Sequence, residues 1–400
     1  MPHPLIRPSA REAYSRRTFL RAAGLSAAAL GGAGLLAACG SDSGSAGSSS
    51  AATSTSSASS AATSAATGSS AAGSSAAGSA ASVAPGTYGT IAVQLSWIKN
   101  IEFAGEFFAD SKGYYTEAGF TKVDLLAGGA AGTSAEALVL SKKALVGLSS
   151  PAVTAPAIVN ESAPLKIIGS TYQKNPFCIV SIKEKTPMTS VADMKGKKIG
   201  VQTGGNETIF EGLLKANGMS TSDLTVVPVQ YDPMVVTTGD VDGFMAYLTN
   251  EPILLASRGF TPVTIAFADN GLPLTAETFT VLQETIDTQR DLLKAFLKAE
   301  IRGWTDAVAD PAASAALAVN TYGKDQKLDL KEQTEEATKQ NDLIVSADTR
   351  KNGLFTMTQE LVDGGIKALA AIGVTITAAQ LYDLSLLDEV YRENPDLRSA

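Results

Sequence analysis

Short β-branched and apolar runs alternate with amphipathic stretches over much of this chain, and this alternation limits its fold more than any other feature. Residues 90–95, 122–126, 146–148 and 165–170 have the composition of strands, and the stretches between them are expected to be helices. Helical stretches that connect successive strands favour a parallel sheet covered by crossover helices. The sequence therefore predicts an α/β fold.

A second unit with the same alternation begins near Asn175-Pro176 and ends near Pro262. Beyond residue 288 nearly every segment has the helical period instead. Ligands of open α/β sheets bind at the carboxyl ends of the strands, which in such a chain meet at a cleft between two lobes. We expect one lobe of residues 85–176 and 265–400 with a helical C-terminal part, and an inserted lobe of residues 177–264.

The first 39 residues have the parts of an export signal. An uncharged run over residues 22–36 lies between a basic stretch, Ser15-Arg16-Arg17-Thr18-Phe19-Leu20-Arg21, and Leu36-Ala37-Ala38-Cys39. The paired arginines resemble a twin-arginine signal, and the last four residues resemble a bacterial lipobox. A transmembrane anchor is the alternative, but the run is shorter than the ~20 residues that span a bilayer. We expect Cys39 to carry a lipid that holds the protein at the outer face of the cell membrane.

Residues 40–84 consist almost wholly of Ser, Ala, Gly and Thr, with Asp42 as the one charge. A segment of this composition cannot bury enough apolar surface to offset the entropy lost on ordering. We expect a flexible tether between the lipid and the folded body. At about 5–6 Å times the square root of its length, it reaches roughly 35–40 Å.

The rest of the chain is acidic and contains no histidine. Residues 1–39 hold five of the 32 basic and one of the 40 acidic residues, which leaves a net charge of −12 for the remainder. Without a basic cluster we expect no nucleic-acid partner. The one histidine, His3, lies in the signal, so Ser-His-Asp and Cys-His catalysis are excluded and we expect no metal. Cys178 has apolar neighbours and is expected to be buried and structural.

Three segments, in order along the chain, are similar to one family of binding proteins. The first contains Gln94-Leu95-Ser96-Trp97, Asn100-x-Glu102-Phe103-Ala104-Gly105 and Lys112-Gly113-Tyr114-Tyr115-x-x-Ala118-Gly119. The second is Asp193-Met194-Lys195-Gly196-Lys197-Lys198-Ile199-Gly200-Val201, and the third joins Asp242-Gly243-Phe244 to Tyr247-x-x-Asn250-Glu251-Pro252. Together they resemble the SsuA/THI5-like (NMT1/THI5-like) solute-binding proteins over residues 89–283.

This resemblance implies a type II periplasmic-binding-protein fold and the delivery of a small-molecule solute to the permease of an ABC importer. Members of the family bind thiamine pyrimidine precursors, riboflavin, alkyl sulfonates, taurine or nitrate, and the chain looks most like the vitamin and precursor branch. We expect a monomeric, non-enzymatic protein without catalytic residues or a cofactor. Two alternatives stay open: a binder of an anionic solute such as a sulfonate or taurine, and a carboxylate-based enzyme on the same fold.

In the first lobe, four residues beyond the opening strand are candidates for ligand contacts. Trp97 and Phe103 could stack on a flat ring, and both could instead be core residues. Asn100 and Glu102 could accept ring N–H groups, and either could instead cap the helix that follows.

In the second lobe, Gly205 and Asn206 precede a helix whose free N–H groups could bind a carbonyl or anionic end of the solute, although a plain tight turn is equally consistent. Tyr247, Asn250 and Glu251 follow the last strand of that lobe. The carboxylate of Glu251 could pair with a protonated amine or could simply begin a helix. Weaker candidates end two strands of the first lobe: Gly128-Gly129 and Ser149-Ser150.

Overall fold

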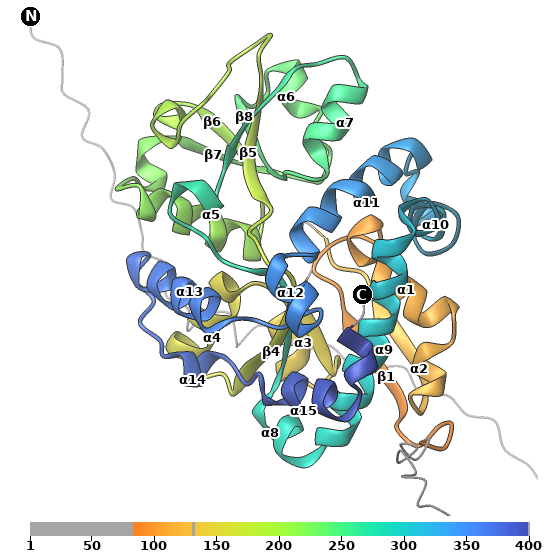
Figure 1. Cartoon of the computed structure of the whole chain (residues 1–400). Coiled ribbons are helices and arrows are strands. Elements are labelled where there is room, and N and C mark those ends of the chain that lie inside the picture. Colours follow the sequence, from red (N-terminus) through yellow and green to blue (C-terminus); the bar gives the residue numbers. More distant parts are fainter. Residues whose placement is uncertain (1–82, 130–132, 399–400) are drawn as a thin grey trace, which may run out of the picture. The chain divides into compact units, whose positions relative to one another are not determined.

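Two five-stranded sheets organise the part of the chain that the computed structural model describes, residues 83–129 and 133–398. The expected signal, Cys39 and nearly all of the tether lie outside the described residues. The first sheet has the order β2-β1-β3-β10-β4, and Figure 1 labels its strands β1 and β4. Its strands are β1 (Gly89–Gln94), β2 (Phe120–Leu126), β3 (Val146–Ser149), β4 (Leu165–Tyr172) and β10 (Ala276–Leu282).

The second sheet has the order β7-β6-β8-β5-β9 and is formed by a continuous part of the chain. Its strands are β5 (Phe177–Ile182), β6 (Lys198–Gln202), β7 (Thr225–Val229), β8 (Gly243–Tyr247) and β9 (Pro262–Ala266). The two sheets, each with its helices, form two α/β lobes, as the sequence predicts.

Both sheets are mixed, so the prediction of parallel sheets is wrong for one part of each. β10 runs antiparallel to β3 and β4, and β5 runs antiparallel to β8 and β9. These two strands enter their sheets directly from the other lobe, without the crossover helix that makes successive strands parallel. The return to the first lobe also comes later than the expected position near Pro262, because β9 still pairs with β5.

Short helices connect the strands within each lobe, and local sequence explains several of their ends. Asn100 caps the 3₁₀ turn Ile101–Phe103 through its side-chain oxygen, and Ser150 does the same for α4, where Pro151 takes the first helical position. The first lobe contains α1 (Ala104–Ser111), α2 (Tyr114–Glu117), α3 (Ala135–Leu140) and α4 (Pro151–Glu161). The second contains α5 (Gly205–Ala216), α6 (Val235–Thr238) and α7 (Glu251–Ser257), with 3₁₀ turns at Val191–Met194 and Thr221–Asp223.

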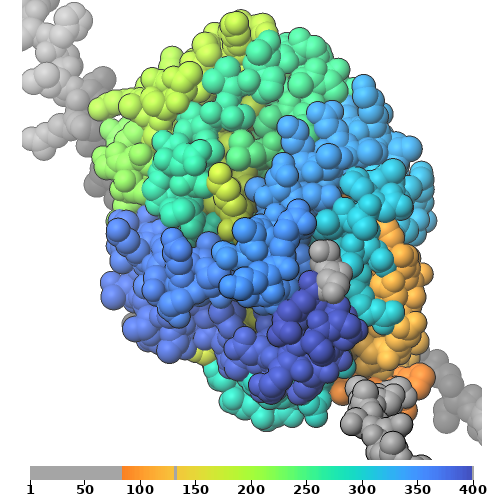
Figure 2. All heavy atoms as spheres, viewed as in Figure 1, coloured from red at the N-terminus to blue at the C-terminus, as the bar shows by residue number. Residues whose placement is uncertain are grey.

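Helices dominate the chain beyond β10, and on the face in Figure 2 these blue residues cover much of the first lobe. They are α8 (Gln283–Thr288), α9 (Arg290–Ala309), α10 (Pro311–Leu317), a π turn (Ala318–Tyr322), α11 (Leu330–Ile344), α12 (Ala347–Asn352), α13 (Gln359–Ala371), α14 (Ala378–Leu381) and α15 (Ser385–Glu393). Short 3₁₀ turns lie at Ala268–Asn270, Lys324–Gln326 and Pro395–Arg398.

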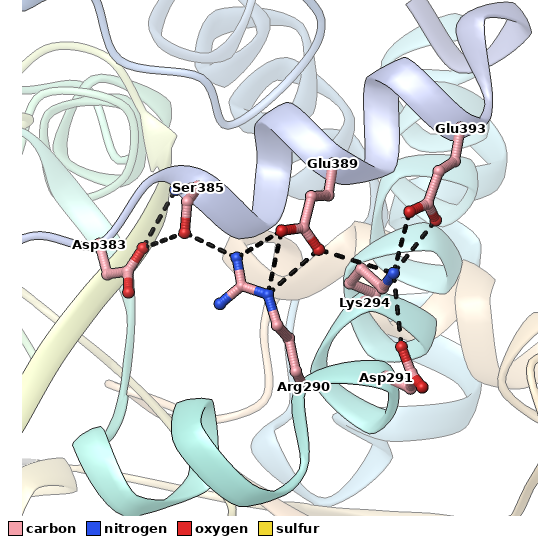
Figure 3. A network of polar contacts seen from close by, with 7 residues as sticks. All are labelled: Arg290, Asp291, Lys294, Asp383, Ser385, Glu389 and Glu393. Atoms are coloured by element: carbon pink, nitrogen blue, oxygen red, sulfur yellow. Dashed lines mark hydrogen bonds and ion pairs between the residues drawn. The ribbon is translucent and has the colours of Figure 1, made fainter.

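An ion-pair network fastens the last helix to α9 (Figure 3). Arg290 binds Glu389 through both Nε and an Nη atom at 2.9–3.1 Å, and Lys294 lies 3.0 Å from Glu393. Fork-shaped pairing of this kind restricts geometry more than a single contact does. The C-terminal helix α15 is therefore held in register along α9, whose position in turn sets that of α1.

The core of the first lobe forms where α9 packs against α1. Trp304 of α9 is 1% exposed, as expected for a structural tryptophan, and it lies against Gly105 of α1. Gly303 faces the Gly105 carbonyl oxygen, so the two helices approach closely only because neither position carries a side chain. Cys178 in the second lobe is completely buried, as predicted, and burial raises its pKa well above the usual range.

Candidate ligand-binding site

A pocket lies between the two sheets and draws its walls from both lobes. The cavity has a volume of about 120 Å³, and its mouth is open to solvent. Four carboxylates line it, and among the described lining residues there is no lysine or arginine. Its polar and aromatic lining comprises Ser96, Trp97, Glu102, Thr133, Ser134, Glu136, Ser149, Ser150, Phe177, Gln202, Thr203, Asn206, Tyr247, Glu251 and Glu277.

Glu277 of β10 stands at the junction of the two lobes. The Ser96 hydroxyl lies 2.9 and 2.8 Å from its two carboxylate oxygens, and the Tyr247 hydroxyl of the second lobe donates to Oε1 at 3.0 Å. Glu277 is 2% exposed, and this burial raises its pKa to about 7 although both hydroxyl bonds oppose the shift. The site therefore holds a carboxylate that titrates near neutrality.

Glu102 makes the second contact between the lobes. Asn100 donates to its Oε1 at 3.0 Å, and the Asn250 amide of the second lobe donates to the same oxygen. Burial raises the pKa of Glu102 well above its ordinary value, and repulsion from Glu277 acts in the same direction. Two amides thus position this carboxylate at the pocket wall.

Glu136 of α3 provides a third buried carboxylate, at 4% exposure. Its Oε1 accepts hydrogen bonds from the Ser149 hydroxyl and, at 2.9 Å, from the Thr154 hydroxyl. Its Oε2 is buried and has no hydrogen-bond partner among the described residues. Glu136 thus carries unused acceptor capacity in the wall of the pocket.

The second lobe contributes the ends of β6 and β8 and the start of α5. Gln202 donates to the Met245 carbonyl at 3.0 Å and accepts from Asn206 at 2.9 Å, which fixes both amides. Glu251 accepts the backbone N–H of Tyr247 at 2.8 Å, and desolvation raises its pKa to about 7. The second-lobe wall is therefore built mainly from amides, backbone, the Glu251 carboxylate and the rings of Phe177 and Tyr247.

The structure separates the nine sequence-predicted residues into three groups. Those that line the pocket are Trp97, Glu102, Gly205, Asn206, Tyr247 and Glu251. Asn100 and Asn250 lie behind it and bind Glu102, so they act on the pocket through that carboxylate. Phe103 is completely buried in the first-lobe core, the alternative role that its apolar surroundings also allow. The weaker candidates Gly128-Gly129 and Ser149-Ser150 line the pocket too.

The polar lining residues that sequence reasoning missed include Ser96, Glu136, Gln202 and Glu277. A usable signal existed for Glu277, which is the one charge in the strand Ala276–Leu282, whose seven residues are all buried. A charged residue inside such a strand requires a specific partner or a function. Glu136 had no comparable signal, because a glutamate near the start of a helix is ordinary.

Two features are absent from residues 83–129 and 133–398. No cluster of His, Cys, Asp or Glu side chains there could hold a metal ion. None of the helices described is both long and apolar enough to cross a bilayer.

Known sequences resemble more than half of this chain. The profile of the family described as NMT1/THI5 like matches residues 100–314. The riboflavin-binding protein RibY of Chloroflexus aurantiacus is 28% identical over 239 residues, which cover 57% of this chain and 65% of RibY. A putative thiamine biosynthesis protein of Haemophilus influenzae is 28% identical over 40% of this chain and 50% of its own length. The chain thus spans less than two thirds of each relative.

Solved structures share the fold at low sequence identity. A protein from Bordetella bronchiseptica superimposes with a TM-score of 0.61 at 17% identity, covering 76% of this chain and 98% of its own. The periplasmic nitrate-binding protein NrtA of Synechocystis gives 0.55 at 14%, covering 77% and 90%. The desulfurization enzyme DszB gives 0.50 at 14%, covering 76% and 99%, so the fold also carries an enzyme. The fold and the family profile agree, and the chain belongs to the NMT1/THI5-like family with a periplasmic-binding-protein fold.

Proposed function

We propose that this chain is the solute-binding protein of an ABC importer and captures a small heterocyclic vitamin or precursor, of the riboflavin or thiamine-pyrimidine type. The observation that carries the proposal is the two-walled pocket with four carboxylates and no lysine or arginine among its described lining residues. Such a lining favours a solute that brings hydrogen-bond donors or positive charge. The two relatives, the riboflavin-binding protein RibY and the thiamine biosynthesis protein, support the same ligand class.

A flat ring has a candidate partner in this pocket. Trp97 lies in its wall and is half-buried, with part of its ring packed on the first-lobe core. Aromatic stacking tolerates many heterocycles, whereas the carboxylates select for donors at the ring edge. We assign ring recognition to Trp97, with Glu102, Glu251, Gly205, Asn206 and Tyr247 as polar or backbone contacts.

The anionic alternative, a sulfonate or taurine, fits the lining less well. A sulfonate group in a water-poor pocket needs cationic or N–H donors, and Glu102 and Glu277 would repel it. The enzymatic alternative rests on the fold alone. We favour binding without turnover, because histidine, the commonest general base, is absent from the chain after His3.

We further propose that export and lipidation at Cys39 place the lobes outside the cytoplasm, where the tether of residues 40–84 lets a monomer reach its permease. Cells that produce the wild type should carry it in the membrane fraction, and Cys39→Ala should release it. A cytoplasmic soluble wild type, or acylation that persists in Cys39→Ala, would contradict this proposal.

Titration of the purified protein with riboflavin, hydroxymethylpyrimidine and taurine tests the ligand class. We expect saturable binding of one of the two heterocycles without conversion to product, measured by calorimetry and mass spectrometry. Closure of the lobes should lower the radius of gyration in small-angle scattering at saturation. Binding of taurine alone would support the anionic alternative, and a chemically altered heterocycle would support an enzyme.

A further inference from the structure

We propose that Glu277 accepts a hydrogen bond from an N–H donor, neutral or cationic, on the solute. The hydrogen bond between Glu277 and Tyr247 couples this recognition to closure of the lobes. The inference rests on the proposed function and names the group by which that site selects its solute. Glu277 belongs to none of the motifs that relate the chain to its family.

The backbone of Glu277 adopts a left-handed conformation, which is unusual for a strand residue other than glycine. Five described residues other than glycine have positive φ, and Glu277, at 50°, is the one among them that lies within a strand. L-residues rarely adopt this region, and such positions concentrate where function demands a particular side-chain direction. The pairing of β10 with β4 is irregular just beyond it, between Thr278 and Thr280.

The effect of this conformation is to place a carboxylate in the pocket wall from the middle of a buried strand. All seven residues of β10 are buried, and Glu277 is the charged one. A buried carboxylate is unfavourable unless donors or a cation surround it. No lysine or arginine lies among the described lining residues that could supply that charge.

The donors that Glu277 does have leave acceptor capacity unused. An ionised carboxylate offers about four lone-pair positions. Ser96 and Tyr247 supply one hydroxyl hydrogen each, at 2.8–3.0 Å from the oxygens. The remaining capacity is available to a solute in the pocket. Burial raises the pKa of Glu277 to about 7, as expected for a carboxylate that still lacks a compensating charge.

Tyr247 makes the same carboxylate a contact between lobes. Its ring lies edge-on to Phe177 at 4.6 Å between centroids, which holds the hydroxyl toward the first lobe. Ser96 follows β1 of the first lobe, so Glu277 accepts one donor from each lobe. A solute that binds Glu277 therefore binds a carboxylate that both lobes contact.

The test compares matched solutes that differ in one donor. The pairs are riboflavin with 3-methylriboflavin, and hydroxymethylpyrimidine with its analogue that lacks the amino group. Wild type should prefer the donor-bearing member of the pair that it binds. Glu277→Gln should weaken the binding of that member by about 10- to 150-fold and abolish the preference. Glu284→Gln, an exposed carboxylate on the adjacent helix α8, should change neither.

Tyr247→Phe removes only the hydroxyl. It should therefore weaken the binding of both members of the pair equally and keep the preference between them. It should also reduce the closure seen by scattering. If Glu277→Gln does not fold, Ser96→Ala replaces it and should lower the preference by loosening the carboxylate. An unchanged preference in a folded Glu277→Gln or Ser96→Ala overturns this inference while the proposed function stands. A wild type that binds neither heterocycle overturns the proposed function and this inference with it.

Discussion

The two lobes share a fold but differ in what they bury. The first lobe and its C-terminal helices bury six carboxylates: Glu102, Glu106, Glu136, Glu277, Glu300 and Glu336. In the second lobe, over residues 177–266, the buried polar residues are uncharged: Ser181, Gln202, Thr249 and Asn250. The costly electrostatic features of this protein are thus concentrated on one side of the pocket.

The carboxylates of the first lobe continue inward from the pocket to the α1–α9 contact. There Glu106 and Glu300 lie in the core, and Tyr115 donates its hydroxyl to Glu300. Burial raises the pKa of both, that of Glu300 to about 8, and repulsion between the two adds to the shift of Glu106. The first lobe therefore carries most of the desolvated carboxylates, whereas the second lobe contributes Glu251 and the hydroxyl and amide donors of Tyr247 and Asn250.

The largest expected consequence is a stability that falls as pH rises. A carboxyl whose pKa is raised in the folded state favours folding fully below its unfolded value of 4.5, and that contribution is lost as pH rises through the folded value. For Glu300 the window runs from 4.5 to about 8, and for Glu277 and Glu251 to about 7. As pH rises through its window, each group lowers the free energy of unfolding by up to about 1.4 kcal/mol per pH unit. Urea titrations from about pH 5 to about pH 8 measure the slope.

Glu300→Gln should reduce this slope, since it removes one titrating group while the amide oxygen can still accept from Tyr115. The exposed Glu284→Gln serves as its control and should leave the slope unchanged. If wild-type stability is flat or rises over this range, the carboxylates of the first lobe are not strained and the comparison between the lobes fails.

A second prediction compares one buried glycine from each lobe. A Cβ at Gly303 would lie 2.1 Å from the Gly105 carbonyl oxygen, which is backbone and cannot rotate away. A Cβ at Gly243 would meet the end of the flexible Met188 side chain at 2.5 Å. Gly303→Ala should therefore cost about 3 kcal/mol of unfolding free energy, and Gly243→Ala about 1 kcal/mol.

Gly364→Ala in α13 is the matched control, because no atom lies within 4 Å of its Cβ position. It should be neutral or stabilising by up to about 1 kcal/mol. Chemical denaturation of the three variants measures the order. Equal losses for Gly303→Ala and Gly243→Ala would mean that the α1–α9 contact adapts as readily as the second-lobe core.

The sequence predicted the regular parts of both lobes because their periodicity is local. The strands expected at residues 146–148 and 165–170 are β3 (Val146–Ser149) and β4 (Leu165–Tyr172), and both begin at the expected residue. Strand β10 was not predicted, because all seven of its residues are buried and its sequence lacks a clear polar–apolar alternation. Its antiparallel direction depends on where the chain re-enters the first lobe, which no local pattern encodes.

The site was predictable where it adjoins a family motif and unpredictable where it depends on long-range pairing. Trp97, Glu102, Tyr247 and Glu251 lie in or beside such motifs and line the pocket. Glu277 acquires its place from pairing between segments 100 or more residues apart and from a positive φ that composition does not reveal. Phe103 shows the opposite case: a motif residue whose burial is complete.

The last prediction concerns the first-lobe aromatic wall and separates it from the carboxylates. Trp97→Ala should weaken binding of the preferred heterocycle by about 1–3 kcal/mol, or roughly 5- to 150-fold, through loss of stacking. Trp97→Phe should recover part of that loss, and the half-buried position makes both changes tolerable for the fold. Trp304 is the other tryptophan of the chain and is buried away from the pocket lining, so ligand-induced changes in emission should come mainly from Trp97.

Calorimetry measures the affinities, and fluorescence of the wild type supplies the independent signal. Since Glu277 selects the donor and Trp97 supports the ring, Trp97→Ala should weaken both members of a matched pair alike and leave their ratio unchanged. Wild-type affinity in Trp97→Ala would mean that the ring of the solute does not stack on Trp97. A changed ratio would instead mean that stacking and donor recognition are coupled, so that Trp97 and Glu277 do not act independently.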